Sequence, residues 1–185
     1  MDFTQVIGKV CKTLDELEVR YALIGGFAMA LRGVQRATTD LDFILFLDDL
    51  ERADSVLTSF GYNQVFHNEN VSHYQAKDQE FGRIDLLHAF RAPTLGMLDR
   101  ADRVAVIPGV DLPVVQIEDI VGLKVQAAKN DPVRGMQDWA DIETMMKEAR
   151  RLNNEPDWEL LQSYLSLFQQ EDRLAWLKNW YGEAQ

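Results

Sequence analysis

The stretch that decides the fold runs from Tyr21 to Phe46 and reads YALIGGFAMALRGVQRATTDLDFILF. It predicts, in order, a strand, a glycine turn, a short helix, a loop and a second, apolar strand. Gly25 and Gly26 stand where the first strand gives way to the helix. Residues without a Cβ let a phosphate approach the backbone, and the start of a helix offers free N–H groups. Alone, such a pair is more often an ordinary turn.

Two carboxylates follow at the start of the second strand. Asp40 and Asp42 are separated by Leu41, and side chains alternate along a strand, so both carboxylates point the same way while Leu41 points to the core. Neighbouring carboxylates repel each other unless a cation lies between them, and Mg²⁺ prefers oxygen ligands. Asp-x-Asp alone usually marks a solvated strand start. The glycine pair and the apolar strand together favour a metal site.

A third carboxylate is expected on a later strand. Asp85 lies within the apolar segment RIDLL of residues 83–87, where an isolated charge is costly to bury. Asp78 and Glu80 lie in a polar segment that reads as an exposed turn and fit worse.

These motifs resemble the DNA polymerase beta-like nucleotidyltransferase superfamily. Its hallmark is Gly-Gly or Gly-Ser, a short helix, Asp-x-Asp or Asp-x-Glu, and a third acid on a later strand. The resemblance implies a nucleotidyltransferase fold of the α+β class, with a mixed sheet flanked by helices and a C-terminal helical bundle. It also implies that Asp40, Asp42 and Asp85 are catalytic residues that hold Mg²⁺, with Mn²⁺ as the alternative ion.

The segment RATTDLD at residues 36–42 is similar to the Arg-x-Thr-x-Asp-x-Asp form of small prokaryotic members. These include the abortive-infection nucleotidyltransferase toxins of type IV toxin–antitoxin systems. In their helical part they carry a lysine, and then an arginine and Lys-Asp-x-x-Asp on the next helix. Here Gln137 replaces the second lysine, so the role of that position is open. The matching positions in this chain are Lys124, Arg134, Asp138 and Asp141. The nucleotide-binding residues that the resemblance implies are Gly25, Gly26, Arg36, Thr38, Thr39 and Lys124.

Lys124 also attracts notice by its pattern, because it interrupts an apolar stripe on the helix expected at 117–129. In one reading its stem lies along the core edge with the ammonium in water. In the other the ammonium reaches a triphosphate across the domain junction. Asp138 and Asp141 share one helix face and would orient Lys124 or Arg134, or would simply be solvated.

Composition narrows the class of protein. The 185 residues carry 19 Lys and Arg against 30 Asp and Glu, a net charge of −11. This charge argues against general electrostatic binding of nucleic acid or anionic lipid. A single cysteine, Cys11, excludes an intrachain disulfide. Residues 1–10 lack the apolar run of a signal peptide and no stretch is apolar enough to span a membrane, so we expect a cytoplasmic protein with no membrane partner.

Periodicity predicts the organisation of the chain. We expect a nucleotidyltransferase core over residues 1–115 and a packed helical region over 116–185. Within them the pattern predicts a helix over 2–18, a short helix over 27–31, and an edge hairpin from 104–107 and 112–115.

The leading hypothesis is a magnesium-dependent nucleotidyltransferase that moves a nucleoside monophosphate from a nucleoside triphosphate to a hydroxyl acceptor and releases pyrophosphate. The acceptor is a small molecule, a protein or an RNA. One alternative is a toxin–antitoxin or phage-defence component that acts through a cognate protein or RNA partner. Another is an inactive nucleotide-binding module, which the three retained carboxylates disfavour. The sequence does not identify the acceptor, the nucleotide, the oligomeric state or the roles of Asp138 and Asp141.

Overall fold

The computed structural model describes residues 1–183, apart from the side chains at positions 132, 134 and 183. By its contacts the chain divides into two compact units. The first comprises Met1–Leu31 and Arg36–Gln116, and the second comprises Arg32–Gln35 and Ile117–Gln185. The described strands all belong to the first unit, and the described part of the second is helical. The predicted α+β class is therefore confirmed.

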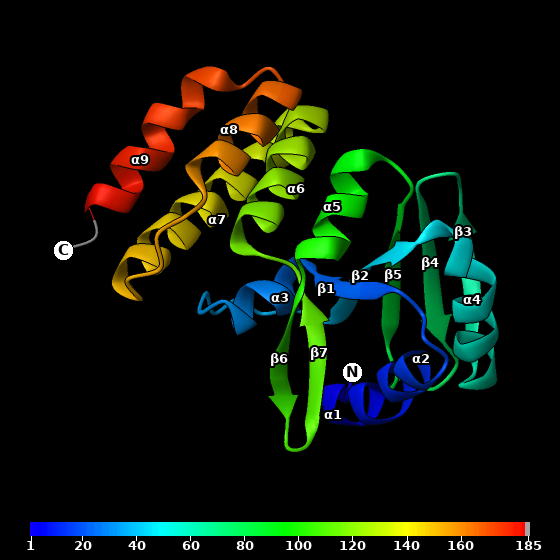
Figure 1. The fold of residues 1–185 in the computed structure, drawn as a ribbon. Helices are drawn as coiled ribbons and strands as arrows, with labels where there is room; N and C mark the ends of the chain where they lie inside the picture. Colours follow the sequence, from blue (N-terminus) through cyan, green and yellow to red (C-terminus); the bar gives the residue numbers. More distant parts are fainter. Residues whose placement is uncertain (184–185) are drawn as a thin grey trace. The chain divides into compact units, whose positions relative to one another are not determined.

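A seven-stranded mixed sheet forms the centre of the first unit, in the order β3-β4-β5-β2-β1-β7-β6 (Figure 1). The pairs β2–β5 and β1–β7 are parallel, and the other neighbours are antiparallel. The strands are β1 (Tyr21–Ile24), β2 (Asp40–Phe46), β3 (Tyr62–His67), β4 (Val71–Ala76), β5 (Arg83–Ala89), β6 (Asp102–Ile107) and β7 (Val110–Val114).

The strands β1 and β2 lie in the middle of the sheet because they are rich in apolar residues. All four residues of β1 are buried, as expected for a strand covered on both faces. In β2, Leu41 and Phe43 are buried while the alternate residues Asp40 and Asp42 remain partly exposed. The strand therefore anchors one face in the core and presents two carboxylates on the other.

Helices cover the sheet of the first unit. Helix α3 packs on β1 and β2, α5 packs on β2 and β5, and α2 packs against α4. The elements are α1 (Phe3–Val6), a π-helical stretch (Ile7–Cys11), α2 (Lys12–Glu16), α3 (Gly25–Leu31), a 3₁₀ turn (Leu47–Asp49), α4 (Leu50–Ser59) and α5 (Ala92–Arg100).

Three elements differ from the sequence-based expectation. The helix expected over 2–18 contains a wide π-helical stretch, whose Ile7, Val10 and Cys11 are fully buried. The helix expected over 27–31 begins two residues earlier, at Gly25, whose φ of +67° is open to glycine at little cost. The expected hairpin forms, but of its two strands only β6 lies at an edge of the sheet, because β7 also pairs in parallel with β1.

The second unit is a group of packed helices, coloured from yellow-green to red in Figure 1. Helix α6 packs against α7 and α8, and α7 packs against α9. None of the described helices combines the length and the hydropathy that crossing a membrane requires. The helices are α6 (Ile117–Asn130), α7 (Pro132–Arg151), α8 (Trp158–Leu167) and α9 (Leu174–Glu183).

Helices α6 and α8 approach closely at Gly122. A Cβ at this position would lie 2.7 Å from the ring of Tyr164, which is closer than such atoms come. The Tyr164 hydroxyl donates a 2.7 Å hydrogen bond to Asp119, which is fully buried. The missing side chain of Gly122 thus lets a tyrosine satisfy a buried carboxylate.

We predict that Gly122→Ala destabilises the chain by about 1–3 kcal/mol, the usual cost of overpacking a core. The matched control is Gly182→Ala in α9, where a Cβ meets nothing within 4 Å. This variant gains helix propensity and is expected to be unchanged or up to about 1 kcal/mol more stable. Urea unfolding followed by circular dichroism measures both, and equal behaviour of the two variants would contradict the close approach.

Candidate functional site

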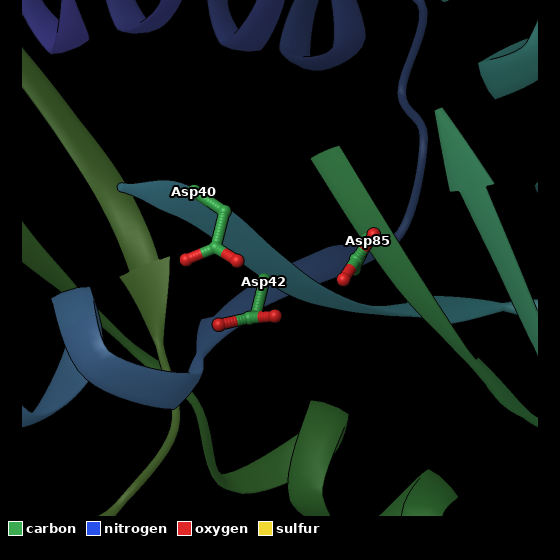
Figure 2. A group of neighbouring side chains, drawn as sticks. All are labelled: Asp40, Asp42 and Asp85. Atoms are coloured by element: carbon green, nitrogen blue, oxygen red, sulfur yellow. The ribbon is translucent and has the colours of Figure 1, made fainter. Parts of the chain in front are cut away.

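Three carboxylates converge on the partly exposed face of β2 and β5. In the parallel register Asp42 lies opposite Asp85, and Asp40 lies opposite Arg83. Asp40, Asp42 and Asp85 each offer one oxygen atom, and the three atoms lie within 4.8 Å of one another. Figure 2 shows the three side chains turned toward a common region. The prediction that these carboxylates meet on adjacent strands is confirmed.

The neighbours of the carboxylates explain why they are held so firmly. Ile84 and Leu86, on either side of Asp85, are buried, as Leu41 and Phe43 are beside Asp42. Alternation then turns each carboxylate away from the core. A one-residue slip of either strand would bury charge and expose these apolar side chains, so the register is strongly specified.

The electrostatics of the cluster centre on Asp42. The pKa of Asp42 is raised from 3.8 to about 7, chiefly by burial and to a smaller extent by the nearby carboxylates of Asp40 and Asp85. The Arg83 guanidinium and the backbone N–H of Gly26 oppose the increase in this pKa. Without a cation, the cluster therefore favours a proton on Asp42 near neutral pH.

Asp85 is held by two donors that the sequence analysis did not assign. Arg83 Nε donates to Asp85 Oδ1 at 2.7 Å. His73 Nδ1 lies 2.8 Å from the same oxygen, and because an ionised carboxylate only accepts, the ring nitrogen donates. Both donors use Oδ1, which leaves Oδ2 for another partner. The Arg-x-Asp alternation signalled Arg83, whereas His73 depends on the register of β4 with β5.

The glycine pair lies beside the carboxylates, at the end of β1. Ile24 pairs with Asp42, and a Cβ on Gly25 would lie 2.0 Å from Asp42 Oδ2. Glycine is therefore required here first of all by the approach of Asp42. A Cβ on Gly26 would lie 3.1 Å from the Thr38 side chain.

The loop before β2 brings Thr38 to the cluster. Thr38 Oγ1 donates to Asp40 Oδ1 at 3.0 Å and so orients the first carboxylate. Arg36 and Thr39, which the resemblance also implicated, are exposed in the same loop. Asp78 and Glu80 are exposed in a turn, as the sequence indicated.

The donor set fits a hard divalent cation. Asp40, Asp42 and Asp85 supply only oxygen atoms, from a rigid pair of strands, and Mg²⁺ is typically bound by a few carboxylates with positions left for phosphate oxygens. A cation at this position would offset the repulsion among the three carboxylates. Among the described residues, this is the group of three or more acidic, histidine or cysteine side chains with metal-binding spacing.

Lys124 belongs to the second unit, where it bridges two helices. Its ammonium lies 3.1 Å from Asp138 Oδ1 and 2.5 Å from Asp141 Oδ2. Only 14% of the lysine side chain is exposed, and 13% and 10% of the two aspartates. The reading with the ammonium in water is wrong, and the aspartates do orient Lys124. Gln137 donates to Asp141 Oδ1 at 3.1 Å, so it adds to this cluster in place of the lysine expected there.

The Arg134 side chain, the other cation expected near these aspartates, lies outside the described residues.

A family model described as the nucleotidyl transferase AbiEii toxin of type IV toxin–antitoxin systems matches residues 12–179. The chain belongs to this family. The suspected resemblance is therefore confirmed over most of the sequence, and as an AbiEii family member the chain is a nucleotidyltransferase.

Several solved structures share the fold of this chain. The antibiotic-resistance factor ANT(2″)-Ia has a TM-score of 0.65 at 18% identity, with 97% of each chain covered. The lincosamide antibiotic adenylyltransferase LnuA has a TM-score of 0.57 at 17% identity, over 76% of this chain and 94% of that one. An antigenic nucleotidyltransferase-like protein from Paracoccidioides brasiliensis has a TM-score of 0.57 at 20% identity, over 96% and 92%. At these identities the likeness shows the fold. No curated protein matches the sequence significantly.

We predict that Asp42→Asn stabilises this AbiEii family member at neutral pH when divalent metal is removed with EDTA. The pKa of Asp42 is about 7 in the folded state, above the ordinary 3.8. At pH values between these two, the folded state therefore binds the proton more tightly than the unfolded state does. The free energy of unfolding of the wild type therefore falls as pH rises from about 4 to about 7. Asparagine does not ionise, so the variant does not lose stability in this way. The free energy of unfolding of Asp42→Asn therefore exceeds that of the wild type by at most about 4 kcal/mol at pH 7–8.

Denaturant unfolding at several pH values measures this difference. Asp78→Asn, in an exposed turn, is the control and should follow the wild type. A pH-independent difference between Asp42→Asn and the wild type would contradict the raised pKa.

We also predict that Lys124→Met destabilises the chain by roughly 3 kcal/mol, because it leaves two mostly buried carboxylates without their countercharge. Lys147→Met is the matched control on α7, where the pair with Glu143 is 43% and 39% exposed and should cost less than about 1 kcal/mol. Adding Asp138→Asn and Asp141→Asn to Lys124→Met should restore much of the stability. A fully stable Lys124→Met would show that the lysine is not a structural counter-ion.

Proposed function

We propose that the chain transfers a nucleoside monophosphate from a nucleoside triphosphate to a hydroxyl acceptor in a reaction that depends on Mg²⁺ or Mn²⁺. The observation that carries this proposal is the convergence of Asp40, Asp42 and Asp85 on two adjacent strands. In the reaction the acceptor oxygen forms a bond to the α-phosphorus. The bond from that phosphorus to the bridging oxygen breaks, and pyrophosphate leaves with the electron pair.

Asp40 and Asp42 are the residues that would hold two ions, and Asp85 would complete the site of one of them. When bound, such ions stabilise the entering and leaving oxygens of the displacement. Arg83 and His73 occupy Oδ1 of Asp85, so its Oδ2 is the oxygen we assign to the ion or to the proton of the acceptor hydroxyl. Thr38 keeps Asp40 in its orientation through Oδ1.

We assign the triphosphate to the side of the cluster that carries Gly25 and Gly26. Gly25 lies directly against Asp42 and Gly26 lies next to Thr38, so both glycines adjoin the carboxylates. Arg36 and Thr39, exposed in the loop that precedes β2, supply further positive charge and hydrogen-bond donors. That Lys124 contacts the triphosphate stays a prediction, since the Lys124 ammonium already forms ion pairs with Asp138 and Asp141.

Membership of a toxin family favours a second, compatible role, as the toxin of a type IV toxin–antitoxin pair with a cognate partner protein. The acceptor would then be an RNA or a protein. A small molecule is the other candidate class, since the fold relatives include a structure with adenylyl-2″-tobramycin and one with lincomycin. An inactive nucleotide-binding module is the reading that three retained carboxylates least support.

One experiment separates these classes. The protein is incubated with each radiolabelled nucleoside triphosphate, with Mg²⁺ or Mn²⁺, and with total cell extract. Label in RNA, in protein or in small molecules identifies the acceptor class. Metal-dependent incorporation that Asp42→Asn lacks supports the proposal, and no incorporation or pyrophosphate release under any condition refutes it.

We predict that a magnesium nucleoside triphosphate stabilises the wild type and not Asp42→Asn. A ligand at about 100 times its dissociation constant adds about 2.7 kcal/mol to the free energy of unfolding, which corresponds to a Tm increase of roughly 5–10 °C for a chain of this size. Asp78→Asn should keep this increase. A Tm increase in Asp42→Asn equal to that of the wild type would place the nucleotide elsewhere.

A further inference from the structure

A partly exposed apolar surface adjoins the carboxylates on the same face of the sheet. We call the four residues Phe66, Val71, His73 and Leu87 the aromatic shelf. His73 pairs with Asp85 across β4 and β5, and Val71 pairs with Leu87 in the same ladder. Directly opposed residues share a face, so the shelf and Asp85 lie on one side of the sheet.

A bulge in β3 brings Phe66 to this face. Gln64 pairs with Tyr74, but the register then shifts so that Phe66 pairs with His73. If the register continued without the bulge, Val65 would lie opposite His73 and Phe66 opposite Ser72, which is fully buried on the other face. The Phe66 and His73 rings stack instead, with their centroids 5.2 Å apart and their planes at 27°.

The shelf is open to solvent and carries no carboxylate. Phe66 is 47% exposed, although it is a large apolar side chain, and the other three members are partly exposed. On the opposite face of the same strands, Ser72, Tyr74 and Leu86 are buried. An exposed aromatic ring beside a catalytic cluster is unneeded for the core and available for a ligand.

The order of the strands indicates which of the two substrates lies against the shelf. Gly25 follows β1, the carboxylates lie on β2 and β5, and the shelf lies on β5, β4 and β3. The attacking and leaving oxygens of a phosphoryl transfer lie roughly in line, on opposite sides of the phosphorus. If the pyrophosphate lies toward Gly25, the acceptor therefore approaches from the side of β4 and β3.

We propose that the aromatic shelf binds the acceptor, and that the acceptor presents a neutral ring face next to its reacting hydroxyl. The proposal rests on the proposed function and names the substrate class of the same site. Aromatic side chains stack on the flat faces of heterocycles and also pack against the C–H groups on one face of a sugar ring. The four shelf residues bear no carboxylate, and the carboxylates that adjoin them are those assigned to the metal ions, so a polycationic acceptor would find no further countercharge on the shelf.

The test uses the full chain with a non-hydrolysable nucleoside triphosphate and Mg²⁺. The probes are uridine for a heterocycle, methyl glucoside for a neutral sugar, and kanamycin for a polycation, each followed by saturation-transfer NMR. At least one neutral probe should bind, and Phe66→Ala should weaken it at least about five-fold, the lower end of what a ring contact contributes. Nucleotide affinity should fall by less than the affinity for the probe.

Two variants control for a merely structural effect. Val65→Ala changes the neighbouring residue of β3, which is 61% exposed and outside the shelf, and should leave probe binding unchanged. Phe66→Tyr keeps the ring and should restore binding.

The proposal is overturned if neither neutral probe binds, or if Phe66→Ala binds the neutral probes as the wild type does. It is also overturned if kanamycin binds more tightly than both neutral probes. Failure of the proposed function is separate, since it shows as a loss of metal-dependent nucleotide binding in the wild type itself.

Discussion

Repulsion among three carboxylates is the constraint on which the rest of this site depends. Asp40, Asp42 and Asp85 would separate in a flexible segment, because each is more stable in water and away from like charge. They stay together because the apolar residues between them are buried and fix both strands. The free energy of the core thus maintains a cluster that is unfavourable by itself and becomes favourable with a cation.

Different neighbouring residues orient each of the three carboxylates. Arg83 and His73 fix one oxygen of Asp85, Thr38 fixes one oxygen of Asp40, and the Gly26 N–H bonds to Asp42. Each carboxylate therefore has a donor that limits its rotation, as a site requires if geometry is to be set before a ligand arrives. Arg83 also supplies a positive charge near all three carboxylates.

The three carboxylates of this site could be predicted from local sequence patterns. Alternation along one strand determines the directions of Asp40 and Asp42, and an apolar segment marks Asp85 as an unusual charge. His73 and Phe66 escaped this reasoning because their positions depend on strand pairing, and the bulge at Val65 reverses the face that alternation alone would assign to Phe66. Lys124 was noticed as an interruption of an apolar stripe, but its pairing with Asp138 and Asp141 depends on how α6 packs against α7.

The position of each strand in the sheet explains why the two halves of the site differ in this way. Strands β2 and β5 are central, so an inserted residue in either would shift a carboxylate to the other face and break two ladders at once. Strand β3 is an edge strand and tolerates a bulge, since only its pairing with β4 is disturbed. A sheet built in this order keeps its charged centre fixed, while its β3 edge tolerates changes in which side chains lie beside that centre. The bulge that stacks Phe66 on His73 is one such change. It lies on an edge strand, where it disturbs the pairing with one neighbouring strand only.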